Sequence, residues 1–122
     1  MENVTFYWLP GCSTCQKAKS FIERHGIRDF EPRDIKENPL SRAEVETLAK
    51  MLGGADELFS RRAVKYREMK LGEREVSPAE MLDLMSEEYT FLKRPILLMK
   101  GKAIAGYFEK FWNQFLEENY YK

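Results

Sequence analysis

The chain opens with a hydrophobic pattern of period two, which changes to a helical period after a turn. Over residues 3–8, valine, phenylalanine and tryptophan occupy alternate positions, and this alternation predicts a strand. The turn signal Leu-Pro-Gly follows, and apolar residues then recur at helical spacing until Gly26. Residues 27–35 form a second extended segment. The predicted order is therefore strand, helix, strand.

The middle of the chain is predicted to be helical. Ser41 and Glu44 have the spacing of a capping box, which begins a helix that Gly53 ends. Residues 56–69 show helical spacing in pieces. Ser77 repeats the capping signature with proline at the first helical position, so a further helix begins there.

The last third of the chain predicts a hairpin and a helix. Residues 96–99 are continuously apolar, as is typical of a strand covered on both faces, and a polar turn leads to a return strand over residues 103–106. A stripe of large apolar residues then follows helical spacing. Its members are Phe108, Phe111, Trp112, Phe115 and Leu116. We expect this helix to pack the stripe on the sheet as core.

The predicted order of elements indicates the fold class. A β-α-β half, a block of helices and a β-β-α half give the layout of an α/β, thioredoxin-like fold with an all-helical insertion between the halves. No internal repeat or linker divides the chain, so we expect a single domain over residues 1–122 with the insertion at about 40–90. Fold alone does not give function.

Charge and hydropathy exclude several classes of function. Twenty basic residues balance twenty acidic ones among 122, which argues against direct nucleic-acid binding by electrostatics. The longest apolar run is far shorter than the roughly 20 residues of a membrane span. The first residues also lack the features of a signal peptide. We expect a cytoplasmic monomer that does not associate with membranes.

The candidate chemistry lies in the pair Cys12 and Cys15. Cys12 falls at the end of the loop and directly before the predicted helix, where free backbone N–H groups and the helix dipole favour an anion. Such placement lowers a cysteine pKa from about 8.5 toward about 3.5–7.5. We therefore predict that Cys12 is the nucleophile. Cys15, one helical turn deeper, is predicted to be the resolving thiol.

A zinc site and a pair of inert thiols are the two other interpretations of the cysteines. Zinc requires about four ligands, whereas the soft ligands here are only Cys12, Cys15 and His25, so no metal site is expected. A pair of inert buried thiols is the second alternative, although a turn that leads into a helix is an unusual place for one.

Arg94 and Pro95 precede the apolar strand and form the second element of the predicted site. In thioredoxin-like folds a cis proline sits opposite the active cysteine, and Pro95 is the natural candidate because X–Pro bonds adopt cis cheaply. Arg94 could hold an anion or the Cys12 thiolate through its forked donors. The alternative is a surface arginine before an ordinary trans proline.

With these residues in view, the chain resembles the arsenate reductase (ArsC)/Spx/YffB family over essentially its whole length. The matching segments are residues 7–19 (YWLPGCSTCQKAK), 37–44 (ENPLSRAE), 59–71 (FSRRAVKYREMKL), 93–97 (KRPIL) and 105–107 (AGY). The resemblance implies that Cys12 is the nucleophile and Arg94 the arginine of the Arg-Pro pair. It also implies a third group that binds the oxyanion, Arg62, with Arg61 as the alternative.

One departure from the family pattern bears on the reaction. Arsenate reductases linked to glutaredoxin carry a further arginine near the last strand, where this chain has Ala-Gly-Tyr at 105–107. Its loss removes a hydrogen bond to a charged group, which is worth about 1.5–3 kcal/mol. The Cys-x-x-Cys pair and the Gly-Tyr ending are more similar to the Spx branch, whose members bind the RNA polymerase α subunit and use the pair as a disulfide switch.

Three hypotheses follow. The first is a thiol-dependent oxidoreductase resembling arsenate reductase, which acts on a small oxyanion or a disulfide. It would bind no cofactor, would use glutathione or another thiol as co-substrate, and would take glutaredoxin or thioredoxin as partner. The second is a redox-switch regulator like Spx that binds the RNA polymerase α subunit. The third is a redox-inactive relative.

Overall fold

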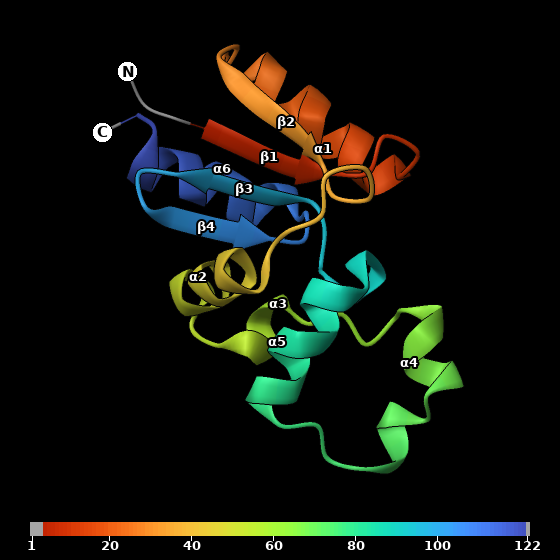
Figure 1. The fold of residues 1–122 in the computed structure, drawn as a ribbon. Coiled ribbons are helices and arrows are strands. Elements are labelled where there is room, and N and C mark those ends of the chain that lie inside the picture. The colour runs from red at the N-terminus through yellow and green to blue at the C-terminus, as the bar shows by residue number, and fades with distance from the viewer. Residues whose placement is uncertain (1–3, 122) are drawn as a thin grey trace. The chain divides into compact units, whose positions relative to one another are not determined.

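The computed structural model describes residues 4–121, which form two compact units (Figure 1). One unit contains the described residues up to Asn38 together with those from Arg94 onward. The other is the continuous segment Pro39–Lys93, which lies in the sequence between the two parts of the first. The first unit is called the sheet unit below and the second the helical unit.

The sheet unit has four strands in the order β2-β1-β3-β4 (Figure 1). The strands are β1 (Val4–Trp8), β2 (Phe30–Asp34), β3 (Ile96–Met99) and β4 (Lys102–Ala105). β1 pairs with β2 in parallel and with β3 antiparallel, and β3 and β4 form an antiparallel pair. The two helices of this unit are α1 (Ser13–Arg24) and α6 (Glu109–Asn119). The order of elements agrees with the prediction from hydrophobic spacing.

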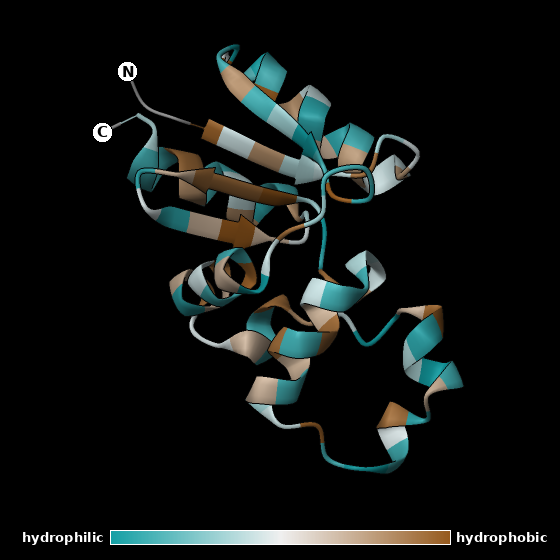
Figure 2. Cartoon of the chain, in the orientation of Figure 1, coloured by the Kyte–Doolittle hydropathy of each residue, from teal (hydrophilic) through white to brown (hydrophobic). Residues whose placement is uncertain are grey.

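One face of this sheet packs against α1 and α6 to form the core of the unit. The apolar character of β1 and β3 that supplies this core is visible in Figure 2. The buried members are Val4, Phe6, Ala18, Phe21, Ile22, Ile27, Leu97, Met99, Trp112 and Leu116. Trp112 is fully buried, and its indole N–H donates to the Gly106 carbonyl at 2.7 Å, so its polar atom is satisfied.

The predicted aromatic stripe of α6 is only partly core. Trp112 and Leu116 are buried, whereas Phe108 and Phe111 are exposed. Phe108 precedes the helix in an extended conformation, so it does not continue the helical stripe. Phe111 lies about 100° around the helix axis from Trp112, which places it on the flank of the buried face. Helical spacing alone does not predict that the buried stripe of α6 is narrower than its apolar stripe.

The helical unit contains four short α-helices and two 3₁₀ turns. These are α2 (Arg42–Leu52), α3 (Ala55–Leu58), α4 (Val64–Glu68), η1 (Leu71–Glu73), α5 (Pro78–Glu87) and η2 (Tyr89–Phe91). The predicted capping box is present, because the Glu44 amide donates to the Ser41 hydroxyl at 3.1 Å and the Ser41 amide donates to the Glu44 carboxylate at 2.9 Å. α2 ends at Gly53, whose φ of +100° is in the left-handed region that favours glycine.

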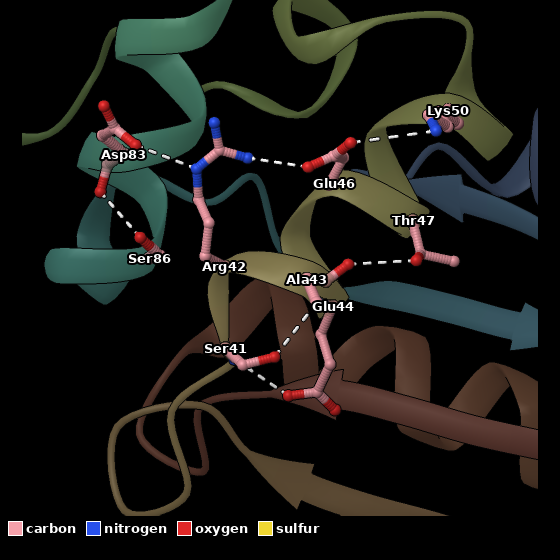
Figure 3. A network of polar contacts seen from close by, with 9 residues as sticks. All are labelled: Ser41, Arg42, Ala43, Glu44, Glu46, Thr47, Lys50, Asp83 and Ser86. Carbon is pink, nitrogen blue, oxygen red and sulfur yellow. Dashed lines mark hydrogen bonds and ion pairs between the residues drawn. The ribbon is translucent and has the colours of Figure 1, made fainter.

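α2, α3 and α5 pack together, and a polar network joins two of them on the outside. Arg42 on α2 donates to Asp83 on α5 at 2.9 Å and to Glu46 on its own helix at 3.0 Å (Figure 3). Inside, the Phe59 and Phe91 rings stack with centroids 5.3 Å apart. Among residues 4–121, no helix combines the length and apolar composition that a membrane span requires.

Candidate functional site

The two cysteines lie where the loop that follows β1 leads into α1. Two hydrogen bonds fix the intervening loop: the Cys12 N–H donates to the Leu9 carbonyl at 3.0 Å, and the Gln16 side chain donates to the Pro10 carbonyl at 2.6 Å. Cys12 then occupies the N-cap of α1 with an extended backbone (φ −91°, ψ 118°). Both cysteines are free thiols in this structure. The loop therefore presents a sulfur at the point where a helix needs an acceptor.

The Cys12 sulfur caps α1. It accepts a hydrogen bond from the Cys15 backbone N–H at 3.4 Å, a role that a serine or aspartate oxygen fills in most helices. The first turn of α1 contains no acidic residue, so no carboxylate there competes for the helix dipole. The predicted placement at a helix N-terminus is confirmed.

The surroundings of Cys12 favour its thiolate. Partial burial raises the pKa of this thiol, but the opposing contributions together outweigh burial and leave the pKa lowered. They are a backbone hydrogen bond from Cys15, a hydrogen bond from the Cys15 thiol, the positive charge of Arg94, and a backbone hydrogen bond from Thr14. A cysteine with a lowered pKa and a half-exposed sulfur has the properties of a nucleophile.

Cys15 has the opposite properties. Its side chain is fully buried, and this burial is the main reason that its pKa rises to about 12. The hydrogen bond to Cys12 and the charge of the Cys12 thiolate raise the pKa further, whereas a backbone hydrogen bond with Leu9 and the charge of Arg94 lower it. The pair therefore consists of one thiol that ionises easily and one that keeps its proton.

The pairing of β1 with β3 explains why Arg94 acts on Cys12. Tyr7, near the end of β1, pairs with Ile96, the first residue of β3. Arg94 and Pro95 directly precede that strand, so they lie at the sheet end from which the cysteine loop leaves. The Arg94–Pro95 bond is cis, as the sequence predicted. Three predicted site residues of the sheet unit, Cys12, Cys15 and Arg94, thus interact electrostatically.

The remaining candidate, Arg62, belongs to the helical unit. It lies in the segment between α3 and α4, its side chain is exposed, and its backbone N–H donates to the Ser60 hydroxyl at 3.3 Å. The alternative, Arg61, is held by Asp56 in an ion pair of 2.6 Å. Among the carboxylates of residues 4–121, none forms an ion pair with the Arg62 guanidinium group. A role of Arg62 at the thiol stays a prediction.

The sequence predicted that backbone N–H groups at the helix start favour an anion at Cys12, but it did not show which residues supply them. The N–H groups of Thr14 and Cys15 both stabilise the Cys12 thiolate, and any residue except proline at those positions would supply them. The only signal for them was the predicted helix start. Within residues 4–121, no group of three or more histidine, cysteine or acidic side chains is gathered as a metal site.

Comparison with known proteins gives a consistent result. The sequence model of the ArsC family matches residues 7–115. The uncharacterized protein YusI of Bacillus subtilis (strain 168) is 36% identical, over 97% of this chain and 98% of YusI. The global transcriptional regulator Spx of Streptococcus pyogenes serotype M1 is 28% identical, over 98% of this chain and 89% of Spx.

Among solved structures, the arsenate reductase of Vibrio cholerae is 25% identical. Its fold agrees with a TM-score of 0.80 over 94% of this chain and 96% of that one. Together with the observed element order and sheet order, this likeness confirms the predicted thioredoxin-like fold with helices between its two halves.

Proposed function

Because the chain belongs to the ArsC family, we propose that it is a thiol-dependent oxidoreductase in which Cys12 is the nucleophile and Cys15 the resolving thiol. The observation that carries the proposal is the Cys12 sulfur at the N-terminus of α1, with its pKa lowered beside a buried second thiol. The named activity of the Vibrio cholerae neighbour supports a small oxyanion as substrate, and a disulfide is the other class.

In the first step on a disulfide, the Cys12 thiolate attacks one sulfur of the substrate. A bond forms between Cys12 and that sulfur, and the other sulfur leaves with the electron pair of the broken bond. The lowered pKa increases the fraction of Cys12 that is present as the attacking thiolate at a given pH. The product of this step is a mixed disulfide on Cys12.

In the second step, Cys15 loses its proton to solvent and attacks the Cys12 sulfur. The mixed disulfide breaks, and the substrate thiol leaves with the electron pair and takes up a proton. The Cys12 charge, which helps to raise the pKa of Cys15, is absent in the mixed disulfide, so Cys15 becomes easier to ionise once it is needed. An external thiol such as glutathione, or a glutaredoxin or thioredoxin, then reduces the Cys12–Cys15 disulfide.

An oxyanion substrate follows the same sequence. With arsenate, Cys12 forms a sulfur–arsenic bond and displaces one oxygen as water; attack of Cys15 or glutathione on that sulfur leaves the electron pair on arsenic, which departs as arsenite. Arg94 next to Cys12 offers its forked donors to the oxyanion, and Arg62 is proposed as a second cation. Pro95 is proposed to shape the opposite wall. No bound cofactor takes part.

The test is arsenate-dependent NADPH oxidation coupled to glutathione, glutaredoxin and glutathione reductase. Wild type is expected to turn over and Cys12→Ser to show no turnover. Ser20→Ala, which changes an exposed residue of the same helix, is the matched control and should keep full activity. Turnover in Cys12→Ser equal to wild type would exclude Cys12 as the nucleophile. Cys15→Ser should instead accumulate a mixed disulfide on Cys12 that mass spectrometry detects.

A second candidate function is a redox-switch regulator that resembles Spx. Its support is the similarity to Spx over nearly the whole chain, combined with a cysteine pair close enough to interact. This function predicts that the reduced and oxidised forms differ in affinity for the RNA polymerase α subunit. Calorimetric titration of both forms with the purified subunit checks it, and equal or absent binding by both forms would reject it. Either function is expected for a monomer in the reducing cytoplasm.

A further inference from the structure

The α4 region of the helical unit holds a concentration of positive charge. Residues 61–70 contain five basic residues and one acidic residue, a net charge of +4, although the whole chain has a net charge of zero. Arg61 is held in an ion pair with Asp56. In the part of the chain that the structure describes, Lys65, Arg67 and Lys70 form no ion pair. Their charges therefore remain available to a partner.

The same region exposes apolar side chains. α4 has no buried residue, and Val64 and Met69 are 57% and 45% exposed. Tyr66 is the helix's inward contact, with its ring 6.2 Å from that of Phe59 and against Gly72. α4 is therefore held by Tyr66 and by the buried residues on either side of it, Ala63 and Leu71, while its other side chains are exposed.

The helical spacing places each exposed apolar side chain beside a cation. Residues three and four apart are neighbours on a helix surface, which pairs Val64 with Arg67 and Lys65 with Met69. Methionine is flexible and polarisable, and it suits surfaces that adapt to a protein partner. A nucleic-acid backbone offers phosphate but nothing to cover valine and methionine, and the neutral chain has no overall field to attract it.

We propose that the α4 surface, formed by Val64, Lys65, Arg67, Met69 and Lys70, docks an acidic protein segment that carries apolar side chains between its carboxylates. Charge complementarity steers such a segment to the surface, and the apolar contacts fix its register. This site is separate from the thiol chemistry and does not rest on the proposed function.

The test is an NMR titration of the full-length, reduced, isotope-labelled protein with a defined peptide in which glutamate and leucine alternate. Two comparison probes are a glutamate-only peptide of equal charge and a short duplex DNA. We expect amide shifts concentrated in residues 64–70, and weaker binding of both comparison probes. Equal or tighter binding of either comparison probe would overturn the proposal, and so would peptide shifts that lie elsewhere or do not appear.

Two double variants test the charged residues and the apolar residues of the α4 surface separately. Lys65→Glu with Arg67→Glu should weaken peptide binding about tenfold or more, because two attractions become repulsions. Arg28→Glu with Lys102→Glu, a pair of exposed cations in the sheet unit, is the matched control and should bind as wild type. Val64→Ser with Met69→Ser should remove the preference for the peptide that contains leucine. If either α4 variant binds that peptide as the control pair does, the surface is not a docking site.

Discussion

The backbone N–H of Cys15 donates to the sulfur of Cys12 across 3.4 Å, so one cysteine caps the helix that carries the other. The same contact contributes to the difference between the two thiols, because it helps to lower the pKa of Cys12, whereas the pKa of the buried Cys15 is raised. Any change to this helix start should therefore affect both thiols at once.

The pH dependence of alkylation should separate the two cysteines. Cys12, with its lowered pKa, should react with iodoacetamide at pH values where an ordinary cysteine of pKa about 8.5 is mostly protonated. Cys15, with a pKa of about 12, should stay unmodified through that range. Mass spectrometry of the modified peptide after timed labelling gives both rates. Labelling of Cys15 ahead of Cys12 would contradict the assignment.

Alkaline pH should destabilise the fold through Cys15. The pKa of Cys15 is raised in the folded state, so its contribution to stability is fully present below the unfolded value of about 8.5 and is lost as the pH rises toward 12. Urea unfolding of the reduced protein at increasing pH should show this loss. Cys15→Ala should show a shallower decline, and an identical pH profile in both proteins would refute the linkage.

Arg94→Gln should raise the pKa of Cys12, because it removes the positive charge that favours the thiolate. The thiolate's ultraviolet absorbance as a function of pH measures the change. If an oxyanion is the substrate, turnover should also fall by about tenfold to a hundredfold, the equivalent of one hydrogen bond to a charged group. Arg28→Gln, an exposed cation of the same unit, should change neither value.

Trp112→Ala should lower the free energy of unfolding by about 3–5 kcal/mol, since it empties a fully buried aromatic site and leaves the Gly106 carbonyl without its donor. Phe111→Ala on the exposed flank of the same helix should change it by less than about 0.5 kcal/mol. Chemical denaturation of the two variants checks the difference. Similar losses in both would mean that Phe111 is buried in solution.

Ser41→Ala should lower the free energy of unfolding by about 1 kcal/mol, because the capping box of α2 loses the side chain that accepts from Glu44. Ser20→Ala, at an exposed position inside α1, removes no cap and should be neutral or slightly stabilising. Urea denaturation compares the two serines. An unchanged Ser41→Ala variant would show that the cap is not a stabilising contact.

The sequence predicted features that rest on short-range rules. The capping box at Ser41, the stop at Gly53 and the sulfur at a helix start each depend on a few adjacent residues, and the structure confirms all three. The thioredoxin-like order of elements was equally predictable, because each strand and helix has its own periodicity. The bounds of the elements were less predictable, because the extended segment expected over residues 27–35 contains a strand only over Phe30–Asp34.

Features that depend on tertiary contact were harder to predict. The exposure of Phe111 reflects how wide a face α6 turns to the sheet, which helical spacing does not specify. The influence of Arg94 on Cys12 depends on the register of β1 with β3, which joins segments about ninety residues apart in the chain. Its place beside the proline that precedes an apolar strand pointed to this arginine, and so did the resemblance to a family, whereas composition and periodicity alone gave no reason to choose it among the twenty basic residues.

The division of the sheet unit into two sequence segments has a consequence for synthesis. The central strand β1 leaves the ribosome before its neighbour β3, which follows only after the whole of Pro39–Lys93 has been made. The helical unit is continuous and can begin to fold first, while the backbone N–H and C=O groups of β1 that pair with β3 are still unpaired. The nascent chain therefore carries an ionisable thiol before the arginine that helps to lower its pKa exists, and the full reactivity of Cys12 should arise only after β3 has been made and has paired with β1.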